Sequence, residues 1–101
     1  MDALKEKSFD FAVRIVNLCK YLKSERKEYD IARQLFRSGT NPGAMVRESK
    51  YAESDKDYIH KLSVGQKEIS ETMYWLELLE KTNYLQIDEF KSHLQRRSRN
   101  T

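Results

Sequence analysis

The sequence predicts an all-α fold, an antiparallel up-down-up-down four-helix bundle with a short fourth helix. Apolar residues recur at spacings of three, four and seven over long segments, which is the pattern of amphipathic helices. The chain has only three glycines and one proline, too few for a turn-rich β fold. Short connections between the periodic segments favour an antiparallel bundle. The 101 residues fit one domain, residues 1–101, with 94–101 expected as a frayed tail.

The first helix is expected to begin at Phe9, with Ser8 as its N-cap. Two adjoining apolar lines then give it a wide apolar arc. They comprise Phe11, Ile15, Leu18 and Leu22, and Ala12, Val16 and Cys19. The polar segment 23–27 is predicted to be a turn between antiparallel helices.

Residues 28–53 are predicted to form one long second helix, disturbed near 39–43. Pro42 removes a backbone donor and disfavours α geometry at Asn41, so we expect a kink, or a restart capped by Thr40 or Asn41. Small residues gather in this stretch: Ser38, Gly39, Thr40, Gly43 and Ala44. A phosphate-binding loop would need a preceding strand and a lysine at fixed spacing, and neither is present. We therefore interpret the small residues as a helix–helix contact.

The third helix should begin after Ser54, which with Asp57 resembles a capping box. One apolar line along it comprises Ile59, Leu62, Ile69, Met73, Leu76 and Leu79. A second line, Val64, Trp75 and Leu78, cannot face the same seam as the first. We expect this second line to form an oligomer interface; the alternative is a broad contact within one monomer.

A left-handed residue, Asn83, is expected to end the third helix. Asp88 should then cap the short fourth helix, which contributes Phe90 and Leu94 to the core. The arginine-rich segment 95–101 has no apolar face, and we expect it to fray.

The charge balance is mildly basic, with a net charge of +3. Residues 1–54 hold 11 basic and 8 acidic side chains, whereas residues 55–101 hold 8 of each. The candidate nucleic-acid contacts are Lys20, Lys23, Arg26, Lys27, Arg33, Arg96, Arg97 and Arg99. Binding through them would be electrostatic and largely independent of sequence, and we expect little aromatic stacking because most tyrosines fall on helix-packing positions. The alternative is an ordinary solvated surface.

Four charged residues interrupt otherwise apolar helical patterns: Arg37, Glu48, Glu68 and Glu71. A structural ion-pair network between the second and third helices is the favoured interpretation, because one guanidinium can satisfy two carboxylates. A phosphate or ligand site is the alternative.

The sequence contains no recognisable catalytic or metal-binding motif. Cys19 lies on an apolar helix face, which favours a buried, inert thiol and a reducing cytoplasm. His60 follows Asp57 by three residues, the only spacing similar to a di-iron ligand pair. No apolar run approaches the ~20 residues of a membrane span. We therefore expect no enzymatic activity, no cofactor, no metal, no small-molecule substrate and no membrane contact.

One ordered series of residues resembles a known family. It comprises residues 34–40 (QLFRSGT), 43–44 (GA), Glu48, residues 56–62 (KDYIHKL), Glu68 and residues 71–79 (ETMYWLELL). Over roughly residues 5–94 the chain resembles the bacterial four-helix-bundle family named after the 23S rRNA intervening-sequence proteins. The resemblance implies a small helical bundle and a ring-like homopentamer. A related branch, the accessory protein of diversity-generating retroelements, is a basic ring that works with a reverse transcriptase and nucleic acid.

The chain departs from the family pattern in two places. Residues 40–45 are Thr-Asn-Pro-Gly-Ala-Met, where the family often has Thr-Ser-Ile-Gly-Ala-Asn, so any polar contact of that asparagine is absent. The apolar pattern of the fourth helix also stops at Leu94, earlier than is usual in the family. The leading hypothesis is a non-enzymatic, homo-oligomeric assembly module that binds RNA, DNA or a nucleic-acid enzyme through its basic surface. The alternative is a purely structural protein–protein interaction bundle.

Overall fold

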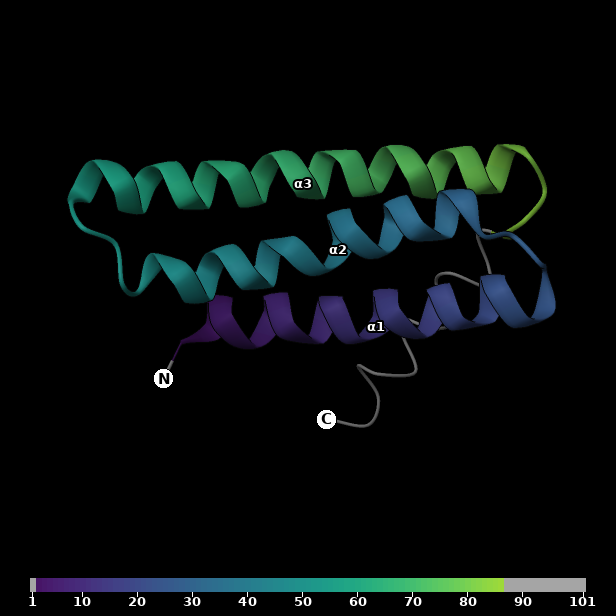
Figure 1. The fold of residues 1–101 in the computed structure, drawn as a ribbon, viewed down its shortest axis with the longest axis horizontal. Helices are drawn as coiled ribbons and strands as arrows, with labels where there is room; N and C mark the ends of the chain where they lie inside the picture. The colour runs from purple at the N-terminus through teal and green to yellow at the C-terminus, as the bar shows by residue number, and fades with distance from the viewer. Residues whose placement is uncertain (1, 87–101) are drawn as a thin grey trace.

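The computed structural model describes residues 2–86, which form three α-helices and no strand. These are α1 (Ala3–Glu25), α2 (Asp30–Ser49) and α3 (Asp55–Lys81). They run antiparallel in succession, with α2 between α1 and α3 (Figure 1). The outer helices each pack mainly against α2. The all-α prediction is confirmed for these residues, and the predicted fourth helix (Asp88, Phe90, Leu94) lies outside them.

The first helix begins six residues earlier than expected. Asp2, not Ser8, is its N-cap: the Asp2 carboxylate accepts the N–H groups of Leu4 and Lys5 at 3.1 and 3.2 Å. Ser8 instead donates its hydroxyl to the carbonyl of Lys5, 3.2 Å away within the helix. Both residue types are good caps, and the expectation at Ser8 is wrong because the helical pattern continues back to Leu4.

A short loop joins α1 to α2, as predicted from the polar segment 23–27. The loop begins after Glu25 rather than at residue 23, because α1 extends to Glu25. Lys27 adopts the left-handed conformation, with φ 56°, and the following N–H of Glu28 returns to the carbonyl of Leu22 at 3.0 Å. This closes the helix in the manner of a left-handed C-cap. The buried Glu28 carboxylate accepts the N–H of Ala32 at 2.9 Å and so caps α2 from just outside it.

The second helix runs without interruption through Pro42. The prediction of one helix through this stretch is therefore confirmed, and of the two disturbances that it allowed, the restart at Thr40 or Asn41 is wrong: Thr40 Oγ1 donates to the carbonyl of Phe36 at 2.8 Å within the helix. Figure 1 shows the axis of α2 bending near its middle, as expected for a proline inside a helix. Pro42 is buried against α3, where the Cα of Pro42 would lie 3.7 Å from a Cβ placed on Gly65. That packing offsets the lost backbone hydrogen bond. The helix ends at Ser49, four residues before the expected boundary.

The predicted caps of α3 are confirmed. Ser54 Oγ accepts the N–H of Asp57 at 3.0 Å, and the Asp57 carboxylate accepts the N–H of Glu53 at 3.1 Å. This hydrogen bond from Glu53 lowers the pKa of Asp57. At the other end Asn83 has a φ of 67°, and the next N–H, of Tyr84, reaches the carbonyl of Leu79 at 2.9 Å.

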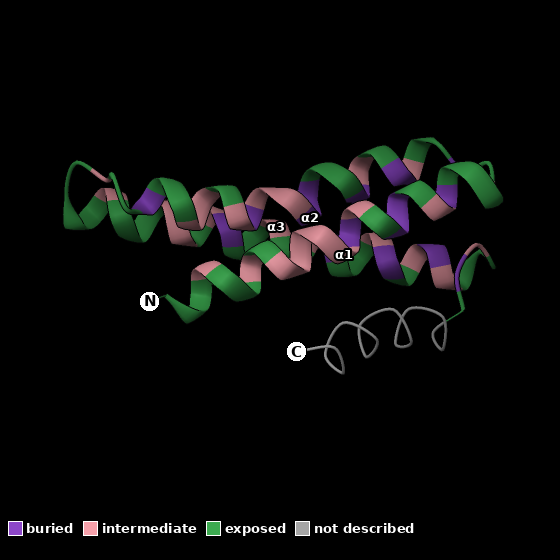
Figure 2. Cartoon of the chain, turned by 90° about the horizontal axis from the view of Figure 1, so that it is seen from below, coloured by how far each residue is buried: buried purple, intermediate pink, exposed green. Residues whose placement is uncertain are grey.

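The core lies toward one end of the three-helix layer. All four fully buried side chains of α1 fall in its C-terminal half, whereas its N-terminal half is half-buried or exposed (Figure 2). They pack with residues of α2, of α3 and of the segment after it. The core consists of Ile15, Leu18, Cys19, Leu22, Ala32, Leu35, Leu76, Leu79 and Leu85. The opposite end of the layer is packed less densely with large side chains.

The small residues of α2 bring α1 close, as the sequence predicted. A Cβ placed on Gly39 would lie 2.6 Å from Ile15 Cγ2. One turn further, a Cβ on Gly43 would lie 3.3 Å from the backbone oxygen of Ser8. The two glycines therefore set the distance between α1 and α2, and the interpretation as a helix–helix contact is confirmed.

Candidate functional site

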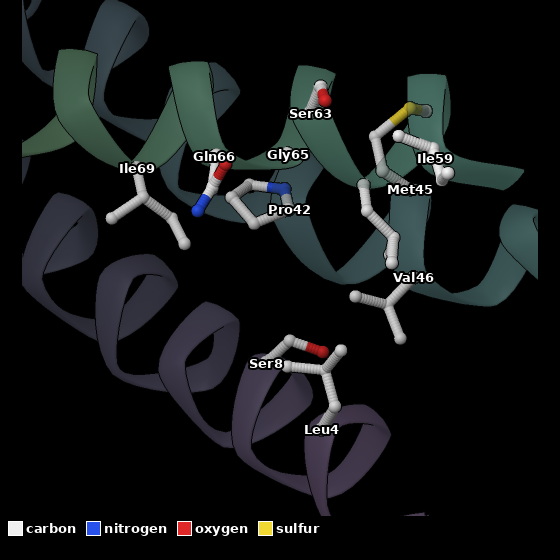
Figure 3. Close-up of a pocket in the computed structure, with 11 residues that line it drawn as sticks. Leu4, Ser8, Pro42, Met45, Val46, Ile59, Ser63, Gly65, Gln66 and Ile69 are labelled. Atoms are coloured by element: carbon white, nitrogen blue, oxygen red, sulfur yellow. The ribbon is translucent and has the colours of Figure 1, made fainter. Parts of the chain in front are cut away.

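An apolar hollow of about 380 Å³ opens on the surface at the less densely packed end. Leu4 of α1 lies on one side of it and Ile59 and Ile69 of α3 on the other, with Pro42 and Val46 of α2 between them (Figure 3). Leu4, Ile59 and Ile69 are 51, 63 and 41% exposed. A ligand could make only a few polar contacts here, so the hollow suits an apolar surface rather than a charged substrate.

The two apolar lines of α3 lie on opposite flanks of the stripe that faces α2. Gly65 and Thr72 belong to that stripe, since Gly65 packs on Pro42 and Thr72 Oγ1 lies 2.9 Å from Ser38 Oγ. At 3.6 residues per turn, the line that includes Ile69 falls on one side of the stripe and the line that includes Trp75 on the other. Both flanks of α3 therefore carry apolar side chains.

The second line, predicted as an oligomer interface, is only half-exposed. Val64, Trp75 and Leu78 are all of intermediate burial. Trp75 packs partly against the core, and its Nε1–H donates to Glu71 Oε2 at 2.9 Å. The more exposed side chains belong to the first line: Met73 is 46% exposed, and Ile59 and Ile69 are also exposed.

Arg37 joins α2 to α3 through two carboxylates. Its guanidinium donates to Glu68 Oε2 at 2.9 Å and to Glu71 Oε2. Glu48 is exposed, and no salt bridge to it is found within residues 2–86. The Arg37 side chain is itself 50% exposed. The network therefore lies at the surface, and it joins α2 to α3 through Glu68 and Glu71 without Glu48.

The candidate basic residues near the α1–α2 loop differ in their availability. Lys20, Lys23 and Lys27 are exposed. Arg33 is exposed and lies 3.8 Å from Asp30. Arg26 is occupied by contacts within the chain, and Arg96, Arg97 and Arg99 lie outside the described residues.

Arg26 fastens the end of α1 to the segment after α3. Its two terminal nitrogens donate to the carbonyls of Tyr84 and Asn83, each at 2.7 Å. The guanidinium carbon also lies 5.6 Å from the centre of the Tyr84 ring. Arg26 is one of the candidate nucleic-acid contacts, but these contacts indicate a structural role in holding the end of α1 against the segment after α3.

The environment of Cys19 keeps its thiol in the unreactive form. Burial raises the pKa of Cys19 to about 11, and the thiol donates to the carbonyl of Ala32 at 3.3 Å, so it stays protonated at neutral pH. Among residues 2–86 no group of three or more His, Cys, Asp or Glu could hold a metal ion. Over the same residues, none of the helices has the length and hydropathy needed to span a membrane.

The sequence matches the family of 23S rRNA-intervening sequence proteins over residues 3–99. The chain belongs to this family. It also resembles a crystal structure from Bacteroides thetaiotaomicron, described as a protein of unknown function from the S23 ribosomal protein family. That structure is 48% identical, and the alignment covers 90% of this chain and 84% of the other with a TM-score of 0.86. No match was found among curated proteins.

Membership in the 23S rRNA-intervening sequence protein family confirms the resemblance drawn from the sequence. Residues 34–40, which carried much of that resemblance, lie on α2, and residues 56–62 and 71–79 lie on α3. Arg37 and Glu71 lie in those segments and pair between α2 and α3, and Glu68, which also carried the resemblance, is the second carboxylate that Arg37 contacts. The residues that carry the resemblance thus include ion pairs between α2 and α3 and the exposed side chains of Ile59 and Met73.

Removing the Arg37 side chain should have a modest effect on stability. We expect Arg37→Ala to lower the free energy of unfolding by about 1 kcal/mol, because exposed ion pairs contribute little and Glu68 keeps partial access to water. Urea unfolding followed by circular dichroism measures this change. Arg33→Ala is the matched control and should leave stability unchanged, since its pair with Asp30 is long and exposed. A loss of ~3–5 kcal/mol for Arg37→Ala would instead indicate a dry, buried network.

Proposed function

We propose that this chain is a non-enzymatic assembly module, a four-helix bundle that forms a symmetric homo-oligomer and presents basic surface to RNA, DNA or a nucleic-acid enzyme. The observation that carries the proposal is the apolar hollow bordered by the exposed Ile59 and Ile69. Exposed apolar side chains around a hollow mark an interaction surface. The family resemblance favours a second copy as the occupant and implies five subunits.

The two apolar flanks of α3 suit a ring. A ring is built from head-to-tail contacts, in which one surface of a subunit meets a different surface of the next. We propose that the hollow receives apolar side chains of a neighbouring copy, with the half-exposed flank formed by Val64, Trp75 and Leu78 as the second contact surface. The line predicted from the sequence as the oligomer interface (Val64, Trp75 and Leu78) then forms one of the two contact surfaces of each subunit, and the hollow forms the other.

Self-association is tested by light scattering. At tens of micromolar we expect a mass that is a multiple of the 12.1 kDa chain. The double variant Ile59→Lys/Ile69→Lys should shift the mass toward the monomer, because it places two charges in an apolar contact. Ser70→Lys, which adds one lysine at an exposed position next to Ile69 in the sequence, is the control and should keep the oligomer. A wild-type protein that stays monomeric would contradict the proposal.

The nucleic-acid part of the proposal is tested by a salt titration. Affinity should fall steeply with salt, with a logarithmic slope of about −0.9 per phosphate contact on duplex DNA and about −0.7 on single strands. A symmetric oligomer would repeat Lys20, Lys23 and Lys27 and gain by multivalency. Comparing the intact protein with a form that lacks residues 95–101 measures the share of the arginine-rich tail. Tight binding at high salt that depends on sequence would contradict this electrostatic mechanism.

A structural interaction protein without a nucleic-acid role is the second candidate. It is favoured by the engagement of Arg26 with two backbone carbonyls and by the proximity of Arg33 to Asp30, which weaken the basic surface near the α1–α2 loop. If no RNA or DNA binds at ~50 mM salt while the oligomer persists, this second candidate stands.

A further inference from the structure

A second hollow lies at the same end of the three-helix layer as the apolar hollow, opposite the α1–α2 loop. Its volume is about 720 Å³, within the range of ligand sites. The start of α1, the end of α2 and the start of α3 meet around it. Three cationic side chains and two aromatic rings line it: Lys5, Arg47, Lys50, Tyr51 and Tyr58. None of these five residues was a candidate from the sequence.

The two tyrosines are exposed although their backbone is held in place. Tyr51 is 82% exposed, and its N–H donates to the carbonyl of Glu48 at 2.9 Å. Tyr58 is 45% exposed, in the first turn of α3, and its N–H donates to the carbonyl of Ser54 at 3.0 Å. The expectation that most tyrosines serve helix packing is therefore wrong, since four of the six are exposed. At this hollow, exposed ring surface is available to a planar partner.

Positive charge accompanies the rings. The guanidinium of Arg47 lies over the Phe9 ring, 5.2 Å from its centre, which restrains its position. Asp2 is the one carboxylate among the lining residues, and its Oδ1 already accepts the N–H groups of Leu4 and Lys5. The hollow therefore combines a net positive charge with two aromatic surfaces.

We propose that this hollow binds single-stranded nucleic acid, with Tyr51 and Tyr58 stacking on unpaired bases and Lys5, Arg47 and Lys50 neutralising the flanking phosphates. Stacking requires exposed base faces, which a duplex keeps inside its own stack, so the site discriminates single strands from duplexes. The inference rests on the proposed nucleic-acid role and gives that role a specific site. It also differs from binding by lysines alone, because stacking on the rings persists when salt screens the charges.

The test measures the affinity of the purified protein for labelled oligo(U), oligo(dT) and duplex DNA of about 15 nucleotides or base pairs. The double variant Tyr51→Ala/Tyr58→Ala should bind both single strands at least about fivefold more weakly, as expected for lost base stacking, and the duplex unchanged. Tyr51→Phe keeps the ring and should bind like the wild type. Tyr74→Ala is the matched control: Tyr74 is 56% exposed, but it lies on α3 near Glu71 and Glu77, where a phosphate would be repelled.

The outcomes separate this inference from the proposed function. If the wild type binds single strands and the double tyrosine variant binds them equally well, the stacking site is refuted while the proposed function stands. The stacking site is likewise refuted if oligoglutamate of similar length competes as well as oligo(U), since that shows a site for polyanions in general. If the wild type binds none of the three nucleic acids at ~50 mM salt, both are refuted.

Discussion

Replacing Leu35 by alanine is expected to lower the free energy of unfolding by about 2–5 kcal/mol. Leu35 is fully buried on α2, the helix that both other helices contact. The substitution removes apolar surface from the core and leaves a cavity that the surrounding backbone fills only in part. In a domain of this size, each 1 kcal/mol lowers the melting temperature by roughly 4–8 °C, so melting should fall by at least about 8 °C.

Thermal and urea unfolding of Leu35→Ala, followed by circular dichroism, provide the measurement. Leu4→Ala is the matched control, because the same side chain is removed from a position that is 51% exposed beside the apolar hollow. We expect this control to cost less than about 1 kcal/mol in the monomer. Equal losses for the two variants would mean that the core is not concentrated at the end where Leu35 lies.

Gly39→Ala should also destabilise the protein, by a net amount of up to about 2 kcal/mol. An added methyl group would lie 2.6 Å from Ile15 Cγ2, and Ile15 is β-branched and only 1% exposed, so it has little room to move. Overpacking of this kind costs about 1–3 kcal/mol. The higher helix propensity of alanine returns about 1 kcal/mol of that loss. The expected sign is therefore opposite to the usual gain from replacing a glycine within a helix.

Gly65→Ala is the internal control for this effect. A Cβ at Gly65 would find Met45 Cβ at 3.6 Å and Pro42 Cα at 3.7 Å, which are ordinary contact distances. The same substitution should therefore stabilise the protein by about 0.5–1 kcal/mol through helix propensity. Measuring both variants under the same urea conditions removes any general effect of alanine. A stabilised Gly39→Ala variant would show that α1 and α2 are not in close contact at that point.

Local sequence signals predicted the helices and several of their ends. The capping pair of Ser54 and Asp57 and the left-handed Asn83 depend on neighbouring residues in the chain, and both were predicted correctly. The start of α1 was missed because Asp2 and Ser8 are both good caps, and the early turn carries only Ala3 and Leu4 as apolar residues. One helix through Pro42 was predicted, but the choice between a kink and a restart depends on packing against Gly65, which is 23 positions away in the sequence and gives no local signal.

The candidate sites were harder to predict. Helical periodicity gave two apolar lines on α3, but which line is more exposed depends on where α2 lies, and that is a tertiary property. The pairing of Arg37 with Glu68 and Glu71 could be foreseen, because those residues lie on helices expected to be neighbours. The hollow shared by Lys5 and Arg47 combines residues 42 positions apart, and the antiparallel pairing of α1 with α2 brings them together.

The central position of α2 also has a kinetic consequence. The three helices form two overlapping hairpins, α1–α2 and α2–α3, and their main contacts join helices adjacent in the sequence. Such topologies have low contact order and fold quickly, since little loop entropy is lost before contacts form. Because α2 belongs to both hairpins, folding can nucleate from either one. Substitutions in α2 should therefore slow folding, whereas those in the first half of α1 should mainly speed unfolding, a difference that stopped-flow chevron plots would reveal.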